Sequence, residues 1–135
     1  MHLRSSSYAG FKYYQKAIDY FRAQYKHPLF LVTSDDPGKA QAFIIQEHKD
    51  KGDIAFVGTI DQALEGKIPK HASSVIDLAI LAACDHVIVS HGTFGMWAAF
   101  LASSDNTHIM HASQIEQVAA IKAANILNFI YMDDT

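Results

Sequence analysis

The stretch that decides the fold is HVIVSHGTFGMWAAFL, residues 86–101. The apolar run at 87–89 passes into a small polar turn at 90–93, and the chain then resumes as the apolar segment 94–101. A short β-branched run is typical of a buried strand, whereas a longer apolar segment after a glycine-bearing turn suits a buried helix. The stretch therefore predicts a strand, a tight turn and a helix, in that order.

The rest of the chain repeats this alternation. Further strands are expected at 29–33, 54–57 and 107–111, and residues 126–131 suit either a last strand or a loosely ordered tail. The other helices are expected at 11–25, from Pro37 to about residue 51, from Ser74 to Cys84 and, capped by Ser113, at 113–124. Such alternation predicts parallel strands joined by helical crossovers. We therefore expect one domain over residues 1–135, an α/β Rossmann-like parallel sheet with helices on both faces.

Three of these helices carry a predicted buried face. The first helix has apolar residues at steps of three and four, namely Phe11, Tyr14, Ile18, Phe21 and Tyr25. The helix from Ser74 is apolar nearly all round and is expected to be buried. In the helix after the 90–93 turn, the side chains expected in the core are Phe94, Met96 and Trp97.

Composition excludes several classes of function. The 135 residues suffice for one domain, with 50% hydrophobic and 19% charged residues. A net charge of -3 without a basic run argues against nucleic acid as a partner. The single cysteine, Cys84, lies in an apolar run and is expected to be a buried thiol. No apolar run approaches the length of a membrane span and no signal peptide is recognisable, so the chain as given is expected to be soluble.

In an open parallel sheet, ligands bind beyond the carboxyl ends of the strands. The Ser90–Thr93 turn lies at such an end and precedes a helix, whose unpaired N–H groups and positive dipole end suit a phosphate. The alternative is an ordinary strand-to-helix turn in which Thr93 is the N-cap.

Other polar residues allow two interpretations each. Asp77 either forms a capping box with Ser74 or accepts two hydrogen bonds from a purine, which would select guanine. Asp35 and Asp36 either form a turn and a helix start or contact a ligand. His108 and His111 are spaced i, i+3 but have no acidic or thiol partner nearby in the predicted fold, so no metal site is expected.

Three segments carry a family resemblance: YYQKAIDYF at 13–21, FLVTSDDP at 30–37 and DLAILAACDHVIVSHGTFGMWAAFL at 77–101. The third matches a pattern of an Asp-Leu-Ala-Leu-Leu helix, a Cys-Asp/Asn-His-x-Ile strand and a Gly-Thr-Phe-Gly-x-Trp turn. The chain resembles the carboxyl-terminal, nucleotide-binding half of the α-1,2-fucosyltransferase family (glycosyltransferase family 11), whose members are inverting enzymes that use GDP-fucose. The resemblance covers about residues 8–102, and residues 103–135 match only loosely.

The resemblance implies the donor-binding domain of a GT-B glycosyltransferase and assigns roles to particular residues. Asp77 would hold the guanine, while Gly92, Thr93 and the Phe94 amide would hold the diphosphate, and Asp36 joins this donor-binding set. The family's first donor motif reads His-x-Arg-Arg-Gly-Asp, of which His2 and Arg4 are present. Arg4 is expected to act catalytically by offsetting charge on the leaving diphosphate, although it lies at a terminus expected to be mobile. Ser5 stands where the second arginine is expected.

The expected reaction is transfer of fucose from GDP-fucose to a galactose hydroxyl of a galactoside-terminated glycan, with inversion and without a metal or other cofactor. The resemblance places such enzymes in the Golgi lumen, anchored in the membrane. This chain lacks the family's acceptor domain, stem and anchor, so we expect the isolated chain to be inactive. The competing hypothesis is a non-catalytic GDP-sugar-binding or interaction module of the same fold. A third is an α/β domain with an unrelated small ligand.

Overall fold

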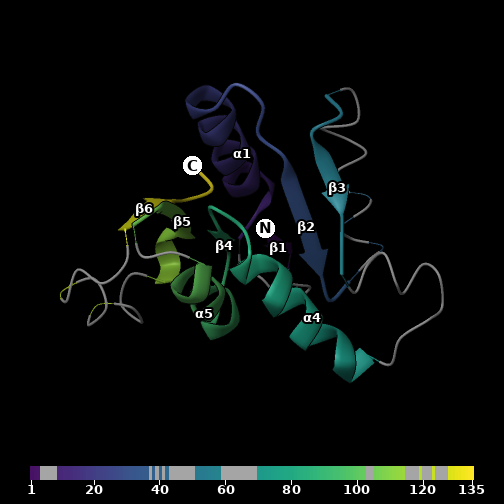
Figure 1. Cartoon of the computed structure of the whole chain (residues 1–135). Coiled ribbons are helices and arrows are strands. Elements are labelled where there is room, and N and C mark those ends of the chain that lie inside the picture. The colour runs from purple at the N-terminus through teal and green to yellow at the C-terminus, as the bar shows by residue number, and fades with distance from the viewer. Residues whose placement is uncertain are drawn as a thin grey trace.

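The computed structural model describes residues 1–3, 9–36, 38, 40, 42, 51–58, 70–102, 105–114, 119, 123 and 128–135. Short strands alternate with helices along these residues, as the sequence predicts (Figure 1). The elements are β1 (His2–Leu3), α1 (Phe11–Gln24), β2 (Phe30–Ser34), β3 (Ile54–Phe56), α4 (Lys70–Ala82), β4 (Ile88–Val89), α5 (Thr93–Ala102), β5 (Thr107–His111), the 3-10 turn η1 (Ala112–Gln114) and β6 (Asn128–Met132).

The strands form two parallel ladders, one in the order β1-β2-β3 and the other in the order β4-β5-β6. Thr33 pairs with His2 in the first ladder, and Ile88 pairs with Ile109 in the second. The ladders adjoin at β1 and β4, where the Ser90 hydroxyl donates to the His2 carbonyl oxygen at 3.5 Å. Strand order therefore runs outward in both directions from the junction between β1 and β4. Such a reversal is the place where open α/β sheets bind ligands.

Helices cover both faces of the strands, as predicted. Successive residues of one strand enter different hydrophobic clusters: Ile109 of β5 packs with α1, whereas the next residue, Met110, packs with α4 and α5. Successive strand side chains point to opposite faces, so the two clusters lie on opposite sides of the strands. Figure 1 shows α1 on one side and α4 and α5 on the other. This arrangement confirms the α/β Rossmann-like fold class.

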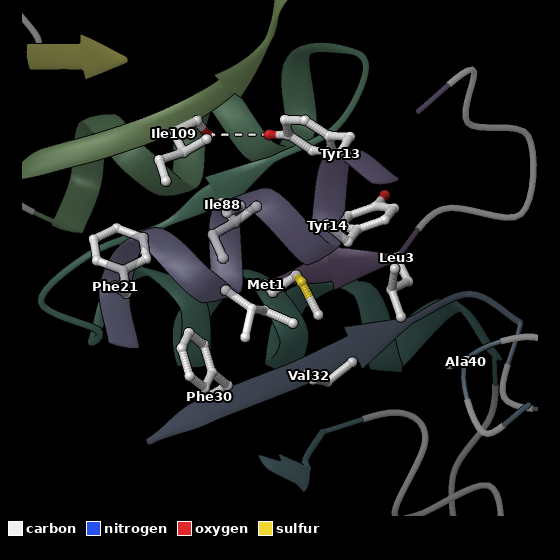
Figure 2. Close-up of a cluster of buried hydrophobic side chains, with 12 residues drawn as sticks. Met1, Leu3, Tyr13, Tyr14, Phe21, Phe30, Val32, Ala40, Ile88 and Ile109 are labelled. Carbon is white, nitrogen blue, oxygen red and sulfur yellow. Dashed lines mark hydrogen bonds between the residues drawn. The ribbon is translucent and has the colours of Figure 1, made fainter. Parts of the chain in front are cut away.

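Helix α1 is attached to the strands through Tyr13, which is fully buried (Figure 2). Its hydroxyl donates to the carbonyl oxygens of Val89 and Ile109, the latter at 3.4 Å. Burial raises the pKa of Tyr13 well above its ordinary value, so the hydroxyl stays protonated and remains a donor. Tyr13 thereby holds the carboxyl end of β4, one residue before the Ser90–Thr93 turn.

Several predicted details are wrong. The strand β1 was not expected, because two residues carry no periodic signal. Tyr25 and Trp97 were expected to be buried, but their exposed fractions are 47% and 54%. Helix α4 is not buried all round as expected, since Val75 is 69% exposed and only one face of the helix enters the core. Cys84 is only half-buried, and its thiol donates to the Ile80 carbonyl oxygen at 3.3 Å.

Candidate functional site

The Ser90–Thr93 turn lies at the junction of the two ladders, at the carboxyl end of β4. Ser90 is buried and contacts β1, as described above. The ring of His2 lies 4.9 Å from that of Phe94, and His2 Nδ1 is 2.7 Å from the Thr33 hydroxyl oxygen. The structure therefore brings His2 together with the turn, although they are at least 88 positions apart in the sequence.

The turn has the geometry of a helix start with a left-handed residue before it. Gly92 has φ = 81°, a conformation that residues with a Cβ adopt rarely, and α5 begins at the next residue, Thr93. Among the described residues, the amides of Thr93 and Phe94 donate to no acceptor. These first-turn amides and the dipole of a ten-residue helix make the turn electropositive. The arrangement can hold an anion beside an exposed threonine hydroxyl.

Asp77 lies in the interior of helix α4 and not in its first turn, where the capping-box hypothesis places it. Helix α4 already includes Lys70, so Ser74 and Asp77 are interior helical residues and cannot form a capping box at its start. Asp77 is 2% exposed and packs on Gly58, which follows β3 and has φ = 69°. A Cβ at residue 58 would lie 2.2 Å from Asp77 Oδ1. The carboxylate is therefore pressed against the backbone at the carboxyl end of β3.

Asp36 forms the start of the next helix, in agreement with the plainer of the two interpretations. Its amide donates to the Ser34 hydroxyl oxygen at 2.9 Å, and its carbonyl accepts from the Ala40 amide at 3.1 Å. Residues 38, 40 and 42 are helical, and the remaining predicted helical residues to 51 lie largely outside the described residues. Asp35 is exposed. Arg4 and Ser5 lie outside the described residues.

A histidine at the end of β5 meets a carboxylate just after the end of β6. His111 Nε2 is 3.2 Å from Asp134 Oδ2, so the expectation that His111 has no acidic partner is wrong. Asp134 also accepts from the amides of Gly10 and Tyr13 at the start of α1. Burial works against ionisation of Asp134, but these hydrogen bonds outweigh it and the pKa of Asp134 is lowered. Within the described part of the chain, no three His, Cys, Asp or Glu side chains are grouped as a metal site.

Sequence reasoning missed Gln114, which lies beside the turn. Its side chain is 2% exposed, and Oε1 accepts from the Gly92 amide at 3.1 Å. Its Nε2 lies 2.6 Å from His91 Nδ1 and 3.3 Å from the Ser113 hydroxyl oxygen. No local motif points to this glutamine, because its partners in the turn, Gly92 and His91, are 22 and 23 residues away in the sequence. The parallel pairing of β4 with β5 brings them together.

Comparisons with known proteins cover most of the chain. The family model described as glycosyl transferase family 11 matches residues 5–133. The chain is 38% identical over 102 residues to galactoside 2-alpha-L-fucosyltransferase Sec1 of Mus musculus, an alignment that covers 76% of this chain and 24% of that protein. It is 39% identical over 98 residues to galactoside alpha-(1,2)-fucosyltransferase 2 of Pongo pygmaeus, with 73% and 25% covered.

The chain thus spans about a quarter of the length of the curated relatives it matches. No solved structure matches it. In the part of the chain that the structure describes, no helix is long and apolar enough to cross a membrane. The match of the family model over nearly the whole chain shows that this chain belongs to glycosyl transferase family 11.

Proposed function

We propose that this chain is the donor-binding part of a galactoside α-1,2-fucosyltransferase. The donor would be GDP-fucose, and the acceptor a galactose hydroxyl at the end of a glycan. The relatives named above carry galactoside fucosyltransferase names, which supports this class of reaction. The complete protein would combine this domain with an acceptor domain in a GT-B arrangement, and would act in the Golgi lumen. No metal is required in this proposal.

The observation that carries the proposal is the position of the Ser90–Thr93 turn. It lies at the reversal of strand order between β1 and β4, where α/β sheets bind nucleotides. The diphosphate would lie on the amides of Thr93 and Phe94, with Gly92 allowing close approach and the Thr93 hydroxyl as a further donor. Arg4, two residues beyond His2, would offset the charge on the leaving diphosphate. Asp36, at the end of β2, borders the same edge of the sheet.

The guanine would be held by Asp77 at the carboxyl end of β3. A carboxylate can accept hydrogen bonds from both the ring N–H and the amino group of guanine, whereas adenine and uracil do not offer this pair of donors. Because Asp77 packs directly on Gly58, the base would enter at the turn after β3. Burial strengthens such charge-assisted hydrogen bonds, since water competes less for the carboxylate.

Calorimetric titration of the chain with GDP, GDP-fucose, ADP and UDP tests the proposal. We expect GDP and GDP-fucose to bind with similar affinity and more tightly than ADP or UDP. Equal binding of all four nucleotides would remove the guanine assignment. Absence of binding by any of them would refute the donor-binding function.

A second function, donor binding without catalysis, is favoured by one observation: Ser5 stands where the family's second arginine is expected. Loss of one preorganised donor to a developing charge commonly costs about 100- to 1,000-fold in rate. An acceptor hydroxyl must also be held in line with the anomeric carbon, which in a GT-B enzyme needs a second domain. We therefore expect GDP affinity without turnover when the chain is assayed for transfer of radiolabelled fucose to a β-galactoside. Turnover that is abolished by Arg4→Ala would show instead that the chain performs the reaction by itself.

A further inference from the structure

Gln114 joins two loops at the carboxyl edge of the strands. It ends η1, directly after β5, and its side chain reaches the β4–α5 turn. Three hydrogen-bonding contacts meet on this one buried carboxamide, to the Gly92 amide, His91 Nδ1 and the Ser113 hydroxyl oxygen. An almost fully buried side chain with both of its polar atoms engaged has one orientation only, so it fixes the loops that it joins.

The chemistry of the partners determines how the carboxamide is turned. The Gly92 N–H can only donate, so the carboxamide oxygen must face it. The NH2 group then faces His91 Nδ1, which must accept, and the ring proton of His91 therefore resides on Nε2. A carboxylate or an aliphatic side chain at residue 114 would fail at least one of these two contacts.

This arrangement separates the amides of the turn into two groups. The Gly92 amide is already occupied by Gln114, whereas the Thr93 and Phe94 amides have no acceptor among the described residues. Because Gly92 is in the left-handed region immediately before α5, its orientation decides where the next two amides point. Gln114 thus determines the direction of the N–H groups that start α5.

We propose that Gln114 is a positioning residue of the diphosphate site. It keeps its hydrogen bond to Gly92 when the ligand binds, and the diphosphate contacts the Thr93 and Phe94 amides rather than that of Gly92. The inference rests on the proposed function for its ligand. It assigns to Gly92 a conformational role, and to Gln114 the role of orienting the turn.

The first experiment uses the unaltered chain, labelled with 15N, and inorganic pyrophosphate as the probe. Before ligand is added, long-range 1H–15N spectra should show His91 with its proton on Nε2. On titration, the Thr93 and Phe94 amide signals should move most. The signals of the Gly92 amide and the Gln114 NH2 group should show that the hydrogen bond between Gly92 and Gln114 persists. Loss of the Gly92–Gln114 contact on binding would overturn the proposal, because Gln114 would then be a displaced occupant.

The second experiment compares Gln114→Leu with Gln24→Leu, the same change at an exposed position at the end of α1. Gln114→Leu should lower pyrophosphate affinity by about tenfold, because the Gly92 N–H loses its acceptor. It should also release the His91 tautomer, because His91 Nδ1 loses the NH2 donor of Gln114. Gln24→Leu should change neither. Unchanged affinity in a folded Gln114→Leu chain would refute the positioning role.

The outcomes separate the two proposals. If the unaltered chain binds neither pyrophosphate nor GDP, the proposed function fails and the diphosphate part of this inference fails with it. If it binds both but His91 carries its proton on Nδ1, only the assignment of Gln114 fails.

Discussion

The two ends of the proposed nucleotide site differ in how they are built. At the β4–α5 turn, the candidate ligand contacts are backbone amides, and a strand, a left-handed glycine and a helix start present them. At the β3 end, the candidate contact is one carboxylate, Asp77, buried in the middle of α4 and pressed against Gly58. A backbone site depends on local conformation, whereas the carboxylate site depends on how a helix packs against a distant turn.

The difference has a consequence for specificity. Backbone amides recognise any phosphate, because they offer only donors and a positive field. A buried carboxylate recognises a particular pair of donors and rejects ligands that leave it unpaired. Substitutions at the turn should therefore affect all phosphate ligands alike, while substitutions at Asp77 should separate one nucleotide from another.

The largest effect is expected for Gly92→Val, which should reduce binding of both pyrophosphate and GDP below detection. A β-branched residue does not adopt φ = 81° without strain, so the first amides of α5 would be redirected. The control is Gly52→Val, which imposes the same strain at φ = 65° in a position where a Cβ meets no described atom within 4 Å. Both variants are measured by calorimetry and by thermal unfolding. Equal loss of binding in the two variants would mean that strain acts through general unfolding and not through the turn.

Asp77→Ala is expected to weaken GDP by about ten- to a hundredfold while leaving pyrophosphate affinity nearly unchanged. The reason is that only the guanine end of the nucleotide loses its partner. The matched control, Asp85→Ala, removes an exposed carboxylate and should alter neither affinity. If Asp77→Ala weakened both ligands to the same extent, Asp77 would serve only to hold α4 against the turn after β3.

Asp134→Asn should lower the free energy of unfolding by about 1 kcal/mol at pH 7, with little effect on GDP. The Asp134 carboxylate caps α1, whose N-cap residue, Gly10, forms no capping bond of its own. Because the folded-state pKa of Asp134 is lowered, its contribution is present above the ordinary carboxyl range near pH 4 and is lost as the pH falls below it. The difference between the two chains in urea unfolding should therefore shrink from pH 7 to pH 3. A constant difference would show that charge plays no part.

The smallest effect is expected for Trp97→Ser, which should leave GDP affinity unchanged and stability within about 0.5 kcal/mol. Although Trp97 stands only four residues after Thr93, its ring lies on the exposed side of α5 against Phe100, with ring centroids 5.7 Å apart. Thermal unfolding and calorimetry of the variant decide the point. A large loss of stability would contradict this exposed position and would indicate that Trp97 packs in the core, as the sequence pattern predicts.

Much of the fold could be predicted from sequence because its signals are local. The strand predicted at 107–111 matches β5 residue for residue, and the apolar segment 94–101 predicted as a helix matches α5 to within one residue at each end. The β4–α5 turn was located in the same way, from a small polar segment between two apolar ones. The predicted start of the helix that contains Asp77 is at least four residues too late, because Ser74 resembles an N-cap whereas the helix already includes Lys70. Side-chain exposure was less predictable, as Trp97 and Tyr25 show, because a helical pattern does not say which apolar residues the sheet will cover.

The sequence by itself determined the order of strands and helices, the presence of a strand-to-helix turn at residues 90–93 and the family to which the motifs belong. Only the tertiary structure decided which residues meet that turn. His2, Thr33 and Gln114 reach the edge where β1 and β4 meet because parallel strands bring their carboxyl ends together, whatever the sequence distance between them. Periodicity and motifs report on neighbours along the chain. Contacts between distant segments depend on strand order, and strand order is settled by packing.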